Sequence, residues 1–342
     1  MKLRVLMLPV CLAAVVTLGA VPARAQTIDI KVGTLAPEGT PWHDVIQEMG
    51  ARWKAASGGR IKLTIFAGGV QGDEPAMILK MRTGQMHMGA FTTVGLETIA
   101  KEMSALWIPL LFQNYDELDY VRDRLSPRFE KALADKGFVV LNWGDAGWVK
   151  YFANSPIPTL KALQAKNLFT WAGNSDSEEM YKDAGFKVVP LAATDILQSL
   201  QTGMIDAFPA PATLALANQW FGLAKNMMDI KFAPVVGGTI ITKAMWDKLD
   251  APLRAAMLKT AKEAGEQYKI KIRKLEDDAI AAMVKRGLQI QKLTPQAEQE
   301  WQQTADKFYP KIRGTLIPAD LFDEVRNLVK EYRAQKAVPA KK

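Results

Sequence analysis

The clearest pattern of hydrophobic and polar positions lies in residues 160–210. Three short apolar runs alternate there with two segments of helical periodicity. The runs are Asn167–Trp171, Phe186–Leu191 and Met204–Phe208, and the helical segments are Ser175–Asp183 and Ala193–Thr202. This order predicts a βαβαβ unit with a parallel sheet. Because ligands of such sheets bind at the carboxyl ends of the strands, the same segment predicts one edge of a binding site.

The N-terminal third of the chain follows the same plan. Thr40 before Pro41 is typical of a helix start. Two such units in a chain of 342 residues predict two lobes, since one hydrophobic core rarely organises so long a chain. The predicted elements alternate, strand first, as Thr27–Leu35, Trp42–Ala56, Ile61–Phe66, Asp73–Arg82 and Met86–Thr92.

Further along, the pattern predicts where the chain passes between the lobes. Gly144 and Gly147, which follow the predicted strand Phe138–Trp143, give the backbone freedom that a crossing needs. Lys231–Thr242 is predicted to be a return strand, and Ala251–Arg286 one very long amphipathic helix. The other predicted elements are strands at Trp148–Ala153 and Leu288–Leu293 and helices near Leu96–Met103, Tyr115–Asp135, Pro295–Phe308 and Ala319–Arg333.

The first 25 residues have the pattern of a secretory signal peptide. A basic start precedes the apolar run Val5–Val21, and the small-residue cleavage site Ala23–Ala25 follows it. The mature chain is therefore expected to begin at Gln26 in the periplasm, and an uncleaved membrane anchor is the alternative. No later run is long enough to span a bilayer.

Composition narrows the function classes. Cys11 in the leader is the only cysteine, so the mature chain has no thiol catalysis, cysteine metal site or disulfide. The net charge of +8 is spread through helices and the C-terminal tail, whereas a nucleic-acid binder would show a dense basic face. His43 and His87 lie far apart, and no metalloprotease, serine hydrolase, phosphate-loop or dinucleotide motif occurs. We therefore expect no enzyme, no cofactor and no metal site.

Two segments carry a family resemblance when they are taken in order. VQGDEPAMILKMRTGQMHMGAF at 70–91 and VVPLAATDILQSLQTGMIDAF at 188–208 resemble the solute receptors of tripartite ATP-independent periplasmic (TRAP) transporters. The segments Gly59–Gly69, Ile108–Val121 and Gly238–Leu249 are similar to the same family. The resemblance thus covers nearly the whole mature chain.

The resemblance implies an α/β fold of two lobes, each a mixed, mostly parallel sheet flanked by helices, with a long helix spanning both. Lobe I is expected at 26–147 with about 231–250, lobe II at 148–230, and the bridging and C-terminal helices at 251–342. The implied function is a periplasmic receptor that closes on a small organic solute and delivers it to TRAP membrane permease subunits. A receptor of an ATP-driven (ABC) importer and the ligand-binding subunit of a sensor are the alternatives.

At the expected site the chain departs from the family pattern. Typical members hold a substrate carboxylate with an arginine on a second-lobe strand, and the corresponding residue here is Thr170. A second basic position falls near Val149, and Lys150 beside it faces the other side of the strand. A buried carboxylate without a cation costs several kcal/mol, so we expect an aromatic or weakly polar solute, and an organic acid bound in a non-standard way is the alternative.

Tryptophans and short polar side chains are expected to form the site instead. In this architecture several tryptophans fall on segments that border the cleft, where their rings can stack on a flat or apolar solute. Asp145 is expected to accept a hydrogen bond or to hold a cation. For each tryptophan, the alternative is a place in the core. The predicted ligand-binding residues are Thr92, Thr93, Trp143, Asp145, Trp148, Thr170, Trp171, Pro209 and Trp220.

Overall fold

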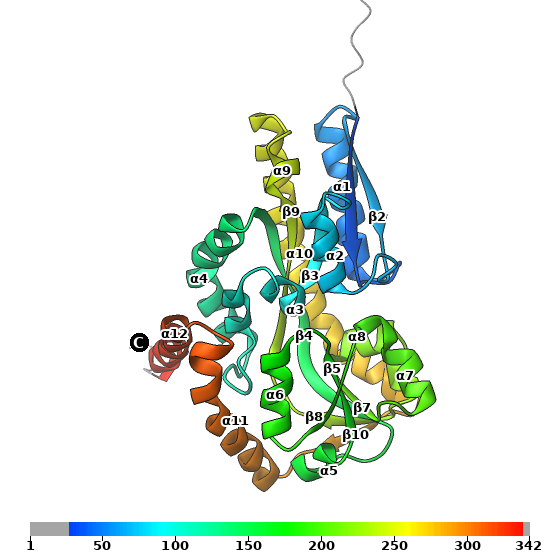
Figure 1. The fold of residues 1–342 in the computed structure, drawn as a ribbon, viewed down its shortest axis with the longest axis vertical. Coiled ribbons are helices and arrows are strands. Elements are labelled where there is room, and N and C mark those ends of the chain that lie inside the picture. The colour runs from blue at the N-terminus through cyan, green and yellow to red at the C-terminus, as the bar shows by residue number, and fades with distance from the viewer. Residues whose placement is uncertain (1–26, 338–342) are drawn as a thin grey trace, which may run out of the picture.

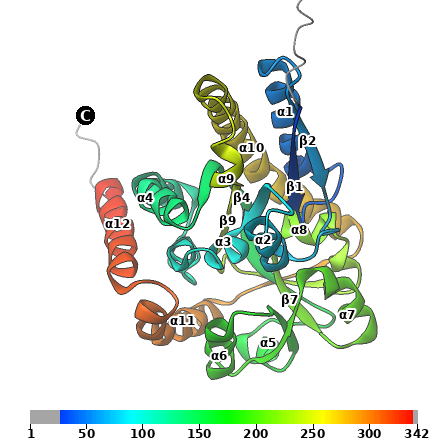
Figure 2. The ribbon, with the colours of Figure 1, turned by 45° about the horizontal axis from the view of Figure 1, so that its top comes forward.

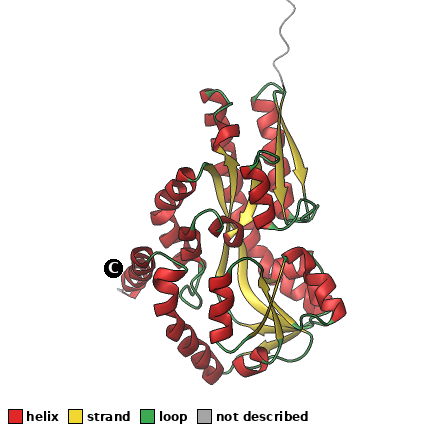
Figure 3. Cartoon of the chain, in the orientation of Figure 1, coloured by secondary structure: helices red, strands yellow, loops and turns green. Residues whose placement is uncertain are grey.

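The computed structural model describes residues 27–337, and the predicted signal peptide lies outside this range. The described strands form one mixed, ten-stranded sheet in the order β2-β1-β3-β9-β4-β7-β5-β6. Off this path, β8 pairs with β4, and β10 pairs with β8. Figure 3 shows these strands in the middle of the molecule with helices around them. None of the described helices combines the length and the apolar character that crossing a membrane requires.

The sheet has two parts that meet at one strand, β4 (Phe138–Ala153). The first half-sheet pairs β1 in parallel with β2 and β3, while β9 runs antiparallel to β3 and to β4. The second half-sheet pairs β5 in parallel with β6 and β7, and β4 antiparallel with β7 and β8. The other strands are β1 (Ile28–Thr34), β2 (Ile61–Phe66), β3 (Met88–Thr92), β5 (Asn167–Trp171), β6 (Lys187–Leu191), β7 (Ala207–Pro211), β8 (Asn226–Asp229), β9 (Pro234–Thr242) and β10 (Gln289–Lys292).

Helices cover both half-sheets, and the longest of them joins the two. The α-helices are α1 (Pro41–Ala56), α2 (Glu74–Arg82), α3 (Thr93–Glu97), α4 (Tyr115–Asp135), α5 (Leu160–Gln164), α6 (Ser175–Asp183), α7 (Ile196–Thr202), α8 (Ala212–Ala217), α9 (Lys243–Trp246), α10 (Ala251–Lys285), α11 (Pro295–Thr315) and α12 (Ala319–Ala337). Three short 3₁₀ segments are η1 (Lys101–Leu106), η2 (Ala193–Asp195) and η3 (Trp220–Gly222). Helix α10 packs against α1, β4 and α8, and therefore spans both half-sheets (Figures 1 and 2).

The C-terminal helices also touch both parts of the molecule. Helix α11 packs on α5 and α6, and α12 packs on α4 and η1. Figure 2 shows α11 beside α6 and α12 beside α4. The chain changes direction between α11 and α12 at Gly314, whose φ of 92° is a left-handed conformation that suits glycine. The C-terminal segment thus forms a second connection between the half-sheets.

The crossing between the half-sheets differs from the sequence prediction. The two predicted strands around Gly144 and Gly147 are one continuous strand of 16 residues, β4. Its pairing with β9 shifts between Asp145 and Gly147, which leaves one extra residue on β4. Gly147 has a φ of 115°, so this glycine permits a β-bulge instead of ending the strand.

Two other predicted elements are displaced for local reasons. The predicted helix near Leu96–Met103 is replaced by the short helix α3 and by η1, which begins only at Lys101. The third strand of the second unit lies at 207–211 instead of 204–208. Its predicted first residue, Met204, donates its amide to the carbonyl of Ser199 at 2.9 Å. That amide closes the end of α7 and is not available for a strand.

Candidate functional site

A cavity of about 380 Å³ lies between the two half-sheets. Four strands place residues at its wall where they end: Thr34 on β1, Thr92 on β3, Trp171 on β5 and Pro211 on β7. The carboxyl ends of the strands therefore face one space, as expected for open α/β sheets. The volume lies in the range of small-molecule sites.

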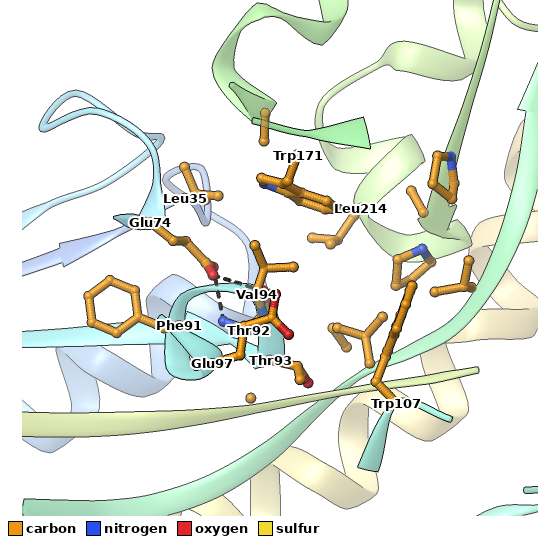
Figure 4. A pocket seen from close by; sticks show the side chains of 18 of the residues that line it. Leu35, Glu74, Phe91, Thr92, Thr93, Val94, Glu97, Trp107, Trp171 and Leu214 are labelled. Atoms are coloured by element: carbon orange, nitrogen blue, oxygen red, sulfur yellow. Dashed lines mark hydrogen bonds between the residues drawn. The ribbon is translucent and has the colours of Figure 1, made fainter. Parts of the chain in front are cut away.

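The structure brings six of the nine predicted site residues to this cavity. These are Thr92, Thr93, Thr170, Trp171, Pro209 and Trp220. Figure 4 shows Trp171 on one side of the space and Thr92 and Thr93 on the other, so the predicted residues come from both half-sheets. The other three, Trp143, Asp145 and Trp148, lie on β4 and are not among the residues that line the cavity.

The side-chain alternation of β4 explains two of these three differences. Asn142, Gly144 and Ala146 line the cavity. Trp143 and Asp145 lie between them, and successive side chains of a strand point to opposite faces. The ring of Trp143 instead packs edge-on against Phe129, with 6.3 Å between centroids. These two residues therefore belong to the far side of the sheet.

The β-bulge explains the third difference. Without it, Trp148 would continue the cavity-facing series of even-numbered residues. The extra residue between Asp145 and Gly147 inverts the phase, so Val149 lines the cavity instead. Trp148 is 2% exposed, and its ring lies 5.4 Å from that of Tyr115.

Asp145 is part of a buried ion network instead of a ligand contact. Its two carboxylate oxygens accept hydrogen bonds at 2.7 Å from Nη1 of Arg122 and Nε of Arg273. Both arginines also pair with Asp119 on α4. The network joins α4, β4 and α10 at the crossing, and both oxygens of Asp145 are occupied. Its expected role as a ligand contact is therefore not supported by the geometry.

The wall formed by β3 and α3 is organised around Glu74, the first residue of α2. Glu74 accepts hydrogen bonds from the amide of Thr92 at 2.9 Å, the hydroxyl of Thr92 at 2.8 Å and the amide of Gly95 at 2.8 Å. The Thr93 hydroxyl donates to the carbonyl of Val236 at 2.8 Å. These bonds fix the end of β3 and the start of α3, so this wall is held in place before any solute binds.

Glu74 also gives the fold a pH dependence. The side chain is 1% exposed, and burial raises the pKa of Glu74 from 4.5 to about 7 against the opposing hydrogen bonds of Thr92 and Gly95. A raised carboxyl pKa stabilises the fold below the unfolded pKa and loses that effect as pH rises through the folded pKa. We therefore expect the free energy of unfolding to fall between about pH 4.5 and 7, by at most about 3 kcal/mol from this group.

Urea unfolding at a series of pH values measures this dependence. Glu74→Ala is the matched variant, because it removes the titrating group while Glu97, whose pKa burial also raises, remains. The variant should show a flatter slope across this interval. An equal slope in the two proteins would contradict the assignment to Glu74.

Several cavity residues were missed by sequence reasoning. Glu74, Glu97, Asn174 and Tyr268 line the space but were not predicted to do so. Two of them carry a recognisable signal, because Glu74 starts a helix and Asn174 follows a strand by three residues. Glu97 and Tyr268 carry none, since their placement depends on how α3 and α10 pack.

Hydrogen bonds cross the opening between the half-sheets. Nδ2 of Asn174 donates to Oε1 of Glu97 at 2.6 Å. The amide of Ala193 donates to Oδ2 of Asp73 at 2.9 Å. Glu97 ends α3 and Asp73 caps α2, both on the first half-sheet, whereas Asn174 and Ala193 belong to segments of the second. The described conformation therefore has the two parts in direct polar contact around the cavity.

Comparison with known proteins agrees with this architecture. The model of the family described as "bacterial extracellular solute-binding protein, family 7" (DctP) matches residues 32–314. The 2,3-diketo-L-gulonate-binding periplasmic protein YiaO of Escherichia coli is 24% identical over 68% of this chain and 71% of its own.

Solved structures share the fold. The sugar acid binding protein DctPAm from Advenella mimigardefordensis, in complex with galactonate, superposes with a TM-score of 0.84 at 16% identity, covering 90% of this chain and 99% of that one. A TRAP periplasmic solute binding protein from Sulfurospirillum deleyianum with bound succinate gives a TM-score of 0.81 at 20% identity, covering 88% and 98%.

Proposed function

Because the chain belongs to family 7 of the bacterial extracellular solute-binding proteins, the DctP family, we propose that it is the receptor of a TRAP transporter. It would present a small organic solute to the membrane permease. The observation that carries the proposal is the cavity of about 380 Å³, which both half-sheets line. Its size and its position at the strand ends suit a small molecule.

We further propose that the half-sheets act as two lobes that close on the solute. Lobe I would comprise residues 26–147 and about 231–250, and lobe II residues 148–230, with the helices after residue 250 holding both. The contacts Asn174–Glu97 and Ala193–Asp73 support this division, because they join the two parts across the opening. Solute contacts from both sides would favour the closed state over the open one. The protein would bind its solute without transforming it.

The basic, apolar and small-residue pattern of residues 1–25 supports export by a cleaved signal peptide. The receptor would then work in the periplasm and meet its permease at the inner membrane. The names of its relatives, such as a diketogulonate-binding protein and a galactonate complex, suggest small organic molecules as the general class.

A thermal-shift screen tests the proposed function. The mature chain, freed of solute by unfolding and refolding, is mixed with a panel of small organic acids, alcohols, ketones and amines. A true ligand at about 100 times its Kd should stabilise the fold by about 2.7 kcal/mol, which raises Tm by several degrees. A panel without any stabiliser, together with no solute released from the freshly purified protein in mass spectrometry, would contradict the proposal.

A cavity-filling variant assigns the effect to the cavity. Leu214 on α8 lines it and is half-buried, so Leu214→Trp should fill the space and remove the stabilisation. The matched control is Leu79→Trp on α2, where the native side chain is 62% exposed. The control should keep the solute response. Equal responses in the two variants would place the solute elsewhere.

A further inference from the structure

The wall of the cavity carries no positively charged side chain. Among the residues that line it, all within 27–337, none is lysine, arginine or histidine, and two are glutamates, Glu74 and Glu97. A carboxylate enclosed here would lose its hydration without gaining a cation, which is strongly unfavourable. Neither glutamate supplies the positive charge that would compensate this loss.

Three cations on β4, α4 and α10, elements that neighbour or line the cavity, are held by acids. Lys150 follows Val149 on β4, is 4% exposed, and donates to Asp229 at 2.9 Å. Arg122 and Arg273 belong to the ion network with Asp119 and Asp145. Turning any of these cations into the cavity would break an existing ion pair. These three cations are therefore not available to the cavity without the loss of an ion pair.

Three polar atoms at this wall lack a partner among the described residues. They are the hydroxyl of Thr170, Nε1 of Trp171 and the hydroxyl of Tyr268. Thr170 and Tyr268 are each 6% exposed. An unpaired buried donor is costly, and the indole N–H can only donate. A solute that offers an acceptor oxygen would satisfy these groups.

A cationic solute is the alternative that Glu97 raises, because its carboxylate lines the cavity. Its oxygens already accept from Ser104 at 2.5 Å and Asn174 at 2.6 Å. An ammonium group could approach this carboxylate, but it has no acceptor to offer. The N–H of Trp171 would then stay unpaired. The unpaired atoms therefore favour an uncharged acceptor over a cation.

Resting on the proposed function, we propose that the solute is an uncharged, mainly apolar molecule with a carbonyl or hydroxyl oxygen, and that a wall without a cation disfavours carboxylates. Apolar rings at the wall fit such a body. Trp42, Trp107, Trp171 and Trp220 all line the cavity, and Figure 4 shows Trp107 and Trp171 on different sides of the space. Indole faces stack on flat or apolar groups.

Matched sets of three solutes test this inference. Each set keeps one six-membered ring and changes the head group on it: acetophenone, benzoate and benzylamine, or cyclohexyl methyl ketone, cyclohexanecarboxylate and cyclohexylmethylamine. Ligand-observed NMR titration of the refolded mature chain gives the dissociation constants. Each ketone should bind at least about tenfold more tightly than its carboxylate and its amine. A carboxylate or an amine that binds as tightly as the ketone would overturn the inference while leaving the receptor function intact.

Two conservative variants assign the acceptor contact. Trp171→Phe keeps an aromatic ring and removes the N–H, so ketone binding should weaken about threefold to tenfold. Trp220→Phe is the matched control. Trp220 also lines the cavity, but its Nε1 is not one of the unpaired buried atoms, so this variant should change ketone binding less. Equal losses in the two variants would contradict the role given to Trp171.

Charge insertion provides the opposite test. Thr170→Arg should raise carboxylate affinity at least about tenfold, with Thr202→Arg, at an exposed residue at the end of α7, as the matched control. Leu214→Lys serves the same purpose if the first variant fails to fold. No gain in either folded variant, or no binding of any solute in the sets to the unmodified protein, would overturn the inference. The broad solute panel and the mass spectrometry of released solute then decide the proposed function separately.

Discussion

Replacing Asp145 by alanine is expected to lower the free energy of unfolding by about 3–5 kcal/mol, because it leaves buried positive charge without a matching acid. The Arg122 side chain is 3% exposed and that of Asp145 is 1% exposed. After the change, two arginines would share Asp119, which is itself partly exposed. Urea unfolding followed by circular dichroism measures the loss.

Two further variants separate charge from packing. Asp320→Ala removes an acid whose side chain is 72% exposed and which pairs with Arg128 at 2.7 Å, and it should change stability by less than about 1 kcal/mol. Adding Arg122→Met to Asp145→Ala removes the uncompensated charge and should recover part of the loss. A loss below that of Asp320→Ala, or no recovery in the double variant, would contradict the network's role.

The ion network also explains why the sequence predicts Asp145 as a ligand contact although its oxygens pair with two arginines. An aspartate between two glycines at the expected crossing resembles a ligand contact in the sequence. Its partners lie 23 and 128 residues away, on helices whose packing no local pattern specifies. Charges within a segment can be counted from the sequence, but the pairs that neutralise them depend on tertiary structure.

Regular elements with strong periodicity were predicted most closely. The long helix was expected over Ala251–Arg286 and is observed over Ala251–Lys285. Its start is fixed locally, since Asp250 caps the helix by accepting from the amide of Leu253 at 2.9 Å. The short helix α3 was missed because the bond from the Gly95 amide to Glu74 belongs to a contact between two helices.

At the cavity, strand ends could be predicted and helix contributions could not. Thr92, Thr170 and Trp171 lie at or near strand termini, and the topology rule places such residues at one edge of a parallel sheet. The side that Trp148 faces depends on one extra residue in β4. A bulge of this kind inverts an alternation that is otherwise readable from the sequence.

Replacing Trp301 on α11 by alanine is expected to destabilise the fold by about 3–5 kcal/mol, as for other buried large-to-small changes. Trp301 is 3% exposed. Its ring stacks on Tyr151 at 5.4 Å and packs edge-on against Phe232 at 5.8 Å. The predicted C-terminal helices would thus be part of the cooperative unit and not an appendage. Trp301→Phe, which keeps most of the ring contacts, should lose clearly less.

The same substitution should weaken solute binding, although Trp301 is not among the residues that line the cavity. Phe232 connects the two places, because its ring also lies 6.0 Å from that of Trp107, which does line the cavity. Removing Trp301 leaves Phe232 free to move and loosens the support of Trp107. Titration with acetophenone in the folded fraction would measure the effect. Unchanged affinity and stability in Trp301→Ala would show that α11 is energetically independent of both the core and the site.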